Sequence, residues 1–413
     1  MKKNFFVFTL PSGLRVLLVP MEGAESVTVL GMVKTGSRYE TPKREGLAHF
    51  YEHMVFKGTQ KYPTKRDLAL AVDKIGAEYN GATSQEYTFY YVKSATKDLD
   101  VGLDIVSQLL IYPLLKQREI EVERGVILEE LHMYEDIPHF KAEMELFKLL
   151  YPQHPLGKSG LGFPKTINSF QSDDFLAFKK RFYTGDKTVV VITGKMKSRE
   201  EMKKKVEYYF ANIKRGQEAT FKPVESLGKR KVGKVKRQTD QVHLALGVRA
   251  LSRLDRQKFV QALLNIILGR GMSSRLFQRI REQEGLCYSI KSDVEPFQDT
   301  GVLTVEAGVD KKRVNEAIER IKKELFLISK EKVSDDELAK AKSYFQGQLA
   351  LSFENSYQQA IFYGKQALLE ENIKEPGDLL KRVKKVDKSS VLSIGKELFS
   401  PENIRLVLVG GED

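Results

Sequence analysis

The stretch GLAHFYEHMVFKGT, from Gly46 to Thr59, carries two histidines four residues apart, His49 and His53, with Glu52 directly before the second. The whole chain of 413 residues has only six histidines, so two in one short stretch call for an explanation. On a helix, residues i and i+4 lie one above the other on the same face. The two imidazoles can therefore bind one metal ion, with the carboxylate of Glu52 beside them.

Two imidazoles and a carboxylate are a common zinc ligand set, and zinc keeps a fourth position open for water. The order His-x-x-Glu-His reverses the more familiar His-Glu-x-x-His, but both orders place the side chains on one helix face. The alternative interpretation is a pair of polar residues on a partly exposed helix. A third ligand is expected from the helical stretch Ile120–Leu131, "IEVERGVILEEL". Glu123 and Glu130 share a face there, so one can bind metal while the other orients a histidine.

The composition is that of a globular protein, with 41% hydrophobic and 30% charged residues. A length of 413 residues indicates two or three domains. The single cysteine excludes a disulfide within the chain and fits a reducing compartment. No apolar run approaches the ~18 residues of a membrane-spanning helix. We therefore expect a soluble, cytoplasmic protein with no membrane partner.

The amino-terminal segment, MKKNFFVFTL, begins like an export signal, with two lysines before an apolar run. The run extends only from Phe5 to Leu10 and then meets Pro-Ser-Gly, whereas an export signal needs a longer apolar core. A β-hairpin fits better, with strands at Phe5–Leu10 and Leu14–Pro20.

The net charge is +13, and part of the excess lies between Gly228 and Arg237, "GKRKVGKVKR". Nucleic acid is a conceivable partner for such a segment. No nucleic-acid-binding motif accompanies it, however, and a charge run is more often a solvated segment. We expect a linker there and no nucleic-acid partner.

The chain contains an internal repeat. "VTVLGMVKTGSR" begins at Val27, and the similar segment "VHLALGVRALSR" begins at Val242. "VVVITG" begins at Val189, and the similar segment "LVLVGG" begins at Leu406. The two pairs are separated by nearly the same distance along the chain. Because this offset is nearly constant at both ends, the sequence indicates two copies of one domain.

Each copy combines strand-like runs with long helical patterns. The predicted fold class is α+β, with two homologous α/β sandwich domains in which helices pack on a sheet. We place a zinc-bearing peptidase domain at 1–214, a basic linker at 215–238, and a homologous second domain without a metal site at 239–413.

The repeat also supplies an internal comparison for the histidine motif. The offset that separates Val27 from Val242 places its three polar positions on Leu264, Ile267 and Leu268. The second copy has an apolar helix where the first copy has a polar cluster. The fold does not require the polar residues, which favours a chemical role for them.

The sequence resembles the pitrilysin family of zinc metallopeptidases, the inverzincins. The resemblance rests on HFYEH followed by Glu130 at the spacing typical of the family, and further matches run along nearly the whole chain. These matches are TLPSGLRVLLVP, GLAHFYEHMVFKGT, YNGATSQEYTFYYV and HPLGKSGLG. The size and the duplicated half resemble the branch of mitochondrial processing peptidase and its bacterial relatives.

The resemblance implies one Zn²⁺ per chain, bound by His49, His53 and Glu130. It implies that Glu52 is the general base and that Glu123 is a supporting carboxylate. A zinc ion polarises the scissile carbonyl and lowers the pKa of a water molecule, and a general base takes the proton.

A strand rich in aromatic and β-branched residues, "QEYTFYYVKS" at Gln85–Ser94, follows "NGATS". If this strand is a sheet edge beside the metal, a peptide can add to it as a further strand. The resemblance places Asn80, Gly81 and Ala82 close to the substrate backbone. The alternative is an ordinary edge or core strand.

The second copy carries its own signature, "LGRGMSSRLFQRIREQEGLCYSI", from Leu268 to Ile290. It resembles the segment that supplies an arginine–tyrosine pair in the carboxy-terminal half of active family members, here Arg281 and Tyr288. Such a pair can donate hydrogen bonds to an oxyanion. The alternative is a basic helix followed by a strand. Cys287 is expected to be a packed residue rather than a nucleophile.

The sequence thus predicts a zinc-dependent endopeptidase that hydrolyses short or unfolded peptides. By resemblance, such chains pair into dimers, so we expect a homodimer or a heterodimer with a related chain. The alternative function is a non-catalytic structural or partner subunit of the same fold. Nothing in the sequence identifies the residues that flank the cleaved bond.

Overall fold

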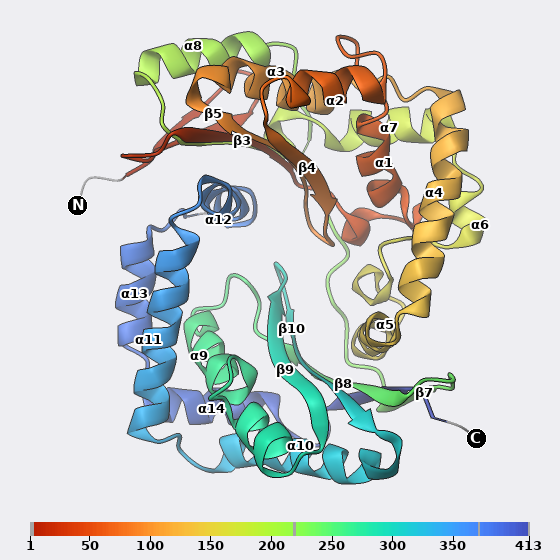
Figure 1. Cartoon of the computed structure of the whole chain (residues 1–413), viewed down its shortest axis with the longest axis vertical. Coiled ribbons are helices and arrows are strands. Elements are labelled where there is room, and N and C mark those ends of the chain that lie inside the picture. Colours follow the sequence, from red (N-terminus) through yellow and green to blue (C-terminus); the bar gives the residue numbers. More distant parts are fainter. Residues whose placement is uncertain (1–3, 218–219, 371, 412–413) are drawn as a thin grey trace. The chain divides into compact units, whose positions relative to one another are not determined.

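The computed structural model describes residues 4–217, 220–370 and 372–411, and the chain forms two compact units (Figure 1). Each unit is drawn from three stretches of sequence. Unit 1 comprises residues 1–131, 159–222 and 351–375, and unit 2 comprises residues 132–158, 223–350 and 376–413.

Unit 1 contains a six-stranded sheet and the helices packed on it. Its strands are β1 (Phe6–Thr9), β2 (Arg15–Pro20), β3 (Ser26–Val33), β4 (Glu78–Thr83), β5 (Thr88–Ala95) and β6 (Thr188–Gly194). Its helices are α1 (Leu47–Val55), α2 (Lys65–Asp73), α3 (Leu99–Ile111), α6 (Pro164–Ile167), α7 (Ser172–Phe182), α8 (Arg199–Tyr209) and α12 (Ser356–Leu369). Helix α4 (Gln117–Asp136) begins in unit 1, and the division between the units falls near its end.

The strands of unit 1 follow the order β1-β2-β6-β3-β5-β4. β1 and β2 pair antiparallel, which confirms the predicted amino-terminal hairpin. β2 and β6 pair parallel, and the remaining neighbours pair antiparallel. Among the described residues, β4 pairs only with β5, so β4 is an edge strand of this sheet.

Alternating side chains of this sheet enter two different cores, because successive residues of a strand point to opposite faces. Val16 and Leu18 belong to the large core with α1, α3 and α7, whereas Leu17 and Val19 belong to a smaller core with α12. Figure 1 shows α3 and α8 over one face of the sheet and α12 on the other. Both faces are covered, as the long apolar runs of β3 and β6 require.

Unit 2 repeats this plan with a five-stranded sheet. Its strands are β7 (Val232–Val235), β8 (Gln241–Ala250), β9 (Cys287–Pro296), β10 (Gly301–Asp310) and β11 (Arg405–Val409). Its helices are α5 (Pro138–Leu150), α9 (Lys258–Gly269), α10 (Val314–Lys330), α11 (Asp335–Ser352), α13 (Pro376–Lys384) and α14 (Lys388–Leu398). A π-helix, Phe277–Gln283, precedes β9.

Short 3₁₀ helices complete both halves. They are Ser37–Tyr39, Pro42–Arg44, Thr96–Asp98, Pro155–Gly157, Gly185–Lys187 and Lys311–Arg313.

The two sheets share one topology. The second follows the order β7-β11-β8-β10-β9, which matches β2-β6-β3-β5-β4 strand for strand. The parallel pair also recurs, since β7 and β11 run parallel as β2 and β6 do. The predicted duplicated α/β fold is confirmed.

The compact units do not coincide with the predicted sequence repeats. Helix α5, from the first half of the sequence, packs on β8 and β11 of unit 2. Helix α12, from the second half, packs on β3 and β6 of unit 1. Each sheet is therefore covered on one face by a helix from the other sequence repeat.

Two local expectations differ from the structure. The strand predicted at Gln85–Ser94 could lie at a sheet edge beside the metal or be an ordinary edge or core strand. It becomes β5, which lies between β3 and β4, so the edge position is excluded. The edge is instead β4, because the turn after Thr83 folds this shorter strand back along β5. The expected basic linker at 215–238 contains strand β7, whose backbone pairs with β11.

Candidate active site

Helix α1 presents an apolar face to the core and a polar face to the candidate site. Leu47, Phe50, Tyr51, Met54 and Val55 are fully buried at helical spacing. The histidines and the glutamate of the motif lie on the other side. The predicted helix at the motif is thus present, and its packing determines which way the polar side chains face.

The start of α1 is held by two features upstream. Gly46 precedes the helix at φ 92°, in the left-handed region, and an added Cβ there would lie 2.7 Å from the backbone of Gly162. The carboxylate of Glu40 accepts the N–H groups of Gly46 at 2.9 Å and Ala48 at 2.7 Å. These bonds satisfy donors that a helix N-terminus leaves open. The sequence did not indicate this role of Glu40, because the residue does not belong to a recognisable helix-capping motif.

His49, His53 and Glu130 form a compact cluster. One ligand atom from each of the three residues lies within 4.8 Å of the other two. The Nε2 atoms of His49 and His53 lie 3.7 and 3.4 Å from Oε2 of Glu130, respectively. The imidazole rings meet edge to face, with centroids 4.8 Å apart. Helix α4 thus brings a carboxylate oxygen to the two nitrogens that α1 supplies.

A second carboxylate of α4 orients His53. Nδ1 of His53 lies 3.0 Å from Oε1 of Glu123, which is nearly buried. An Nδ1–H donated to this carboxylate leaves the Nε2 lone pair directed at Glu130. Lys57 forms an ion pair with the other oxygen of Glu123. Sequence reasoning missed Lys57, although its position four residues after His53 placed it near the motif.

Glu52 lies beside the cluster and is nearly buried. Its Oε2 accepts a hydrogen bond from the hydroxyl of Thr83, on β4, at 3.1 Å. Burial raises the pKa of Glu52, against the opposing effects of His53 and Thr83. A carboxylate with a raised pKa is a stronger proton acceptor. Thr83 was not predicted, and its role depends on a strand pairing that no local pattern reveals.

The pKa values of the two histidines are shifted in opposite directions. Burial, reinforced by the charge that His53 can carry, lowers the pKa of His49 to about 3. Burial alone would lower the pKa of His53, but the hydrogen bond to Glu123 and the nearby carboxylates outweigh it and raise that pKa. His49 is therefore neutral at pH 7 and has a lone pair available for a metal ion.

The donor set fits zinc. Two imidazole nitrogens and one carboxylate oxygen are ligands that zinc binds in catalytic sites, where a fourth position stays open. The Nδ1 atom of His53 is already engaged with a carboxylate, as in many metal-binding histidines. His49, His53 and Glu130 are the residues that would hold the ion.

A pocket of about 390 Å³ adjoins this cluster. It is lined by Glu52, His53, Phe56, Lys57, Lys65, Tyr79, Asn80 and Glu123. One wall is the edge strand β4, which carries the predicted substrate residues Asn80, Gly81 and Ala82. An added Cβ at Gly81 would lie 2.9 Å from the ring of Tyr90, so the packing of β4 at this position requires glycine. A base, a cluster of metal-binding groups and an open strand edge meet at one pocket.

The predicted arginine–tyrosine pair lies in unit 2. The guanidinium of Arg281, in the π-helix, lies 5.4 Å from the ring centroid of Tyr288 on β9, so the two side chains are neighbours. The tyrosine side chain is exposed, and β9 is the edge strand of its sheet. π-Helical turns are frequent at functional sites. Cys287 is buried, and burial raises its pKa to about 11, which agrees with a packed residue.

The second repeat has apolar residues at the positions that correspond to the metal-binding set. Helix α9 follows β8 as α1 follows β3, and its residues Leu264, Ile267 and Leu268 are fully buried. The apolar helix predicted from the repeat offset is confirmed. No second cluster of three metal-binding side chains occurs among residues 4–217, 220–370 and 372–411.

Two family models match successive parts of the chain. One described as "Insulinase (Peptidase family M16)" matches residues 15–162, and one described as "Peptidase M16 inactive domain" matches residues 169–345. The "Uncharacterized zinc protease YmxG" of Bacillus subtilis (strain 168) is 32% identical over 402 residues, covering 97% of each chain. The chain belongs to peptidase family M16. The predicted family resemblance is thereby confirmed.

Other M16 relatives agree with this assignment. A protein of Streptomyces coelicolor named as an uncharacterized zinc protease is 32% identical over 398 residues, covering 95% of this chain and 86% of the relative. A protease from Helicobacter pylori has a crystal structure that matches at a TM-score of 0.92 and 22% identity, covering 98% of this chain and 99% of the other. A structure from Pseudomonas fluorescens described as a peptidase M16 inactive domain matches at 0.93 and 18%, covering 100% and 98%. The structural matches show the M16 fold.

In the described ranges, none of the helices combines the length and the apolar character that crossing a bilayer would need.

Proposed function

We propose that this M16 chain is a zinc-dependent endopeptidase that cleaves short or unfolded peptides. One observation carries the proposal: His49, His53 and Glu130 converge, with Glu52 beside them, at a pocket bordered by an open strand edge. A purely structural subunit has no need of this convergence. The "zinc protease" names of the relatives support the same reaction.

The residues divide the chemistry between them. A zinc ion held by the cluster would supply a Lewis acid that polarises a peptide carbonyl and lowers the pKa of a water molecule. Glu52 would take one proton from the attacking water, whose oxygen bonds to the carbonyl carbon. The same proton would pass to the leaving nitrogen as the C–N bond breaks. Glu123 would keep His53 in the required tautomer.

We propose that substrate adds to β4 as a further strand. β4 pairs on one side only, so backbone groups of Asn80, Gly81 and Ala82 are available to an extended peptide. Main-chain pairing holds many sequences in one register. The substrate must be extended, which favours short or unfolded peptides over folded proteins.

We propose that Arg281 and Tyr288 donate to the oxyanion that forms during attack, and that the protein works as a dimer, with itself or with a related chain. The exposed phenol and its neighbouring guanidinium support the first proposal. The single cysteine supports a reducing compartment, and we propose the cytoplasm.

The decisive experiment combines zinc analysis with mass spectrometry of a digested peptide library. Glu52→Gln should retain zinc and bind peptide, but hydrolysis should fall by about 10²-fold or more, because an amide cannot accept the proton. Glu129→Gln is the matched control: its exposed carboxylate neighbours Glu130 on α4, and activity should not change. Near wild-type cleavage by Glu52→Gln would exclude Glu52 as the base. A zinc-loaded wild type that cleaves nothing in the library would favour the non-catalytic subunit.

A further inference from the structure

A second pocket of unit 1 shares no residue with the active-site pocket. It has a volume of about 670 Å³ and lies among the end of α3, helix α7 and the segment after α8. Small-molecule sites in proteins commonly have volumes of ~300–1,000 Å³. We call it the α3–α7 pocket.

One part of this pocket is apolar. It is formed by Leu110, Ile111, Leu176 and Ile213. Leu110 and Ile213 are buried, whereas Leu176 exposes 47% of its surface. An exposed leucine beside a buried apolar wall offers a surface that an apolar ligand can cover.

The other part is a basic rim of four side chains, Lys179, Lys180, Lys214 and Arg215. Arg215 lies 3.6 Å from Asp186, although 76% of its side chain is exposed. Within the part of the chain that the structure describes, no ion pair joins the three lysines to a carboxylate. The rim therefore carries more positive charge than its surroundings neutralise.

Helix electrostatics explains only part of this charge. Lys179 and Lys180 lie in the last turn of α7, where cations stabilise the helix end. Lys214 and Arg215 follow α8 outside any helix, so that explanation does not apply to them. Burial, together with the charge of Lys214, lowers the pKa of Lys179 from its ordinary value. Two ammonium groups are thus close enough to repel each other.

A buried hydroxyl adds a third observation. Thr184 lines the pocket, and its Oγ1 has no hydrogen-bond partner among the described residues. Buried polar side-chain atoms in native proteins almost always have a partner. The hydroxyl of Thr184 is thus an unsatisfied polar atom of a residue that lines the pocket.

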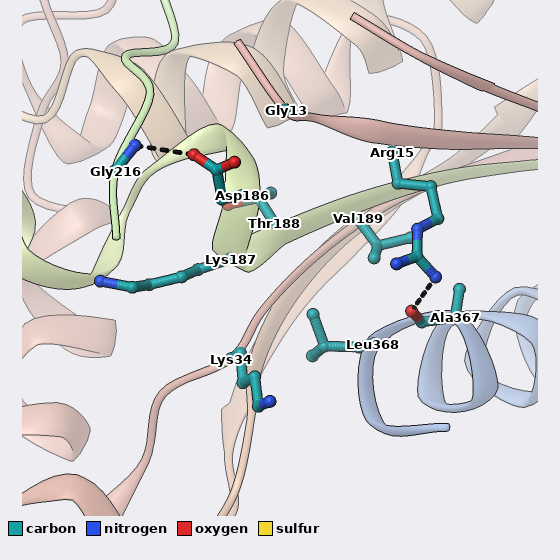
Figure 2. A pocket seen from close by; sticks show the side chains of 10 residues that line it. All are labelled: Gly13, Arg15, Lys34, Asp186, Lys187, Thr188, Val189, Gly216, Ala367 and Leu368. Atoms are coloured by element: carbon teal, nitrogen blue, oxygen red, sulfur yellow. Dashed lines mark hydrogen bonds between the residues drawn. The ribbon is translucent and has the colours of Figure 1, made fainter. Parts of the chain in front are cut away.

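A neighbouring pocket provides the contrast. Figure 2 shows that in this pocket of about 330 Å³ the guanidinium of Arg15 donates to the carbonyl of Ala367, at 2.7 Å. Asp186 places a carboxylate in the same pocket and accepts the N–H of Gly216. Arg15 and Asp186 are thus already engaged within the protein, and the lining of this pocket is mostly polar. The α3–α7 pocket differs because it combines unneutralised cations with an apolar wall.

We propose that the α3–α7 pocket binds a single amphipathic anion, with its charged head at the basic rim and its apolar body against Leu110, Ile111 and Ile213. A medium-chain carboxylate has this chemistry. The volume of about 670 Å³ suits one small molecule rather than a helix, which would need a long groove. The site is independent of the metal cluster and does not rest on the proposed function.

Calorimetric titration of the full chain with decanoate, kept below its micelle-forming concentration, tests the proposal. Saturable one-to-one binding is expected. Replacing Lys179 and Lys214 together by alanine should weaken binding by about tenfold or more, since two charged contacts are lost. Lys34→Ala is the matched control, because it removes a lysine from the neighbouring pocket, and it should leave binding unchanged. Leu176→Ser, at an exposed position, should weaken binding without affecting the fold.

Control ligands and a control variant show whether binding depends on the apolar body, on the negative charge and on the metal cluster. Acetate should bind at least about tenfold more weakly, because it lacks an apolar body, and decyltrimethylammonium should not bind, because its head is cationic. Decanoate should bind His49→Ala as it binds the wild type, since the metal cluster is not its site. The proposal is overturned if decanoate does not saturate, if the double variant binds as the wild type does, or if His49→Ala loses binding. It is equally overturned if only anionic vesicles bind, because the surface would then be a membrane contact.

Discussion

At the scale of single residues, the two sequence repeats can be compared position by position, because they share one fold. The first repeat places His49, Glu52 and His53 where the second places buried apolar side chains. The sequence alone predicted this contrast, because the offset between the repeats is nearly constant. It could not predict Lys57 or Thr83, whose contacts with Glu123 and Glu52 depend on how α1 meets α4 and β4. The spacing of residues along one helix shows which side chains share a face. It does not show which side chains of other elements they contact.

The comparison leads to a prediction about metal content. Wild-type protein should hold about one zinc per chain, because one set of three ligands is present among the described residues. His49→Ala should lose the metal and keep the fold, since the second repeat accepts an apolar residue at the equivalent position. Elemental analysis and circular dichroism measure the two effects. His132→Ala, an exposed histidine on α4, is the control and should retain zinc. Full zinc content in His49→Ala would contradict the assignment.

At the scale of elements, the hydrophobic pattern predicted which segments are helices and strands, but not which strands are neighbours. The richness in aromatic and β-branched residues predicted a strand at Gln85–Ser94, and the structure has β5 at Thr88–Ala95. Its neighbour β3 ends at Val33, far from β5 in the sequence. No local sequence pattern indicates that these two strands pair. The sequence therefore left open whether this strand lies at the edge or in the interior of the sheet. Register and neighbour choice depend on packing across the whole sheet.

An ion pair just before the π-helix that carries Arg281 links this segment to α11. Arg275, just before it, makes two hydrogen bonds to Glu337 in the first turn of α11, at 2.6 and 2.9 Å. These bonds lower the pKa of Glu337 from 4.5 to about 2. A carboxylate with a lowered folded-state pKa stabilises the fold fully above its unfolded pKa. The stabilisation is lost as the pH falls from 4.5 toward 2.

We therefore predict that Glu337→Gln lowers the free energy of unfolding of this region by ~2 kcal/mol at pH 7, less than the full shift implies because the pair is partly exposed. The difference from wild type should shrink when urea unfolding is repeated near ~pH 3, where the wild-type carboxylate begins to lose its advantage. Asp336→Asn removes an exposed carboxylate from the same turn and should have little effect at either pH. A pH-independent difference would show that the charge of Glu337 is not responsible.

At the scale of the whole molecule, the two units exchange helices. Unit 1 needs α12 from the second sequence repeat, and unit 2 needs α5 from the first. The amphipathic pattern of a helix shows that one face is buried but not which surface covers it. For this reason the sequence predicted a division near 214–239, whereas the compact units are interleaved along the chain.

The exchange predicts that the first repeat cannot be isolated intact. A fragment of residues 1–222 would lack α12 and expose Leu17, Leu30 and Val191, which are fully buried in the chain. Such an apolar face should bind a hydrophobic dye and aggregate. Co-expression of residues 351–375 should lower the dye binding of the fragment, because it covers this face of the sheet, whereas the same segment with Tyr363→Asp should not. A soluble, dye-free 1–222 fragment would show that α12 is dispensable.

The last prediction concerns assembly and follows from the separation of the two candidate half-sites. The metal cluster belongs to unit 1, and Arg281 and Tyr288 belong to unit 2. If a two-fold dimer completes each site with the partner's pair, Glu52→Gln and Tyr288→Phe should each be nearly inactive alone. A mixed dimer would then hold one site with both defects and one site with neither. Activity should return to at most about half of wild type in mixed dimers.

The measurement is peptide hydrolysis after subunit exchange, with exchange confirmed by native mass spectrometry. Tyr288→Phe removes one hydroxyl from an exposed side chain, so the fold should be unaffected. Mixing Glu52→Gln with His49→Ala is the control, because both defects lie in unit 1 and every site of the mixed dimer remains defective. Restoration in the first mixture alone would place the tyrosine of one chain at the metal site of the other. If exchange occurs and neither mixture regains activity, the arginine–tyrosine pair acts within its own chain or has no catalytic role.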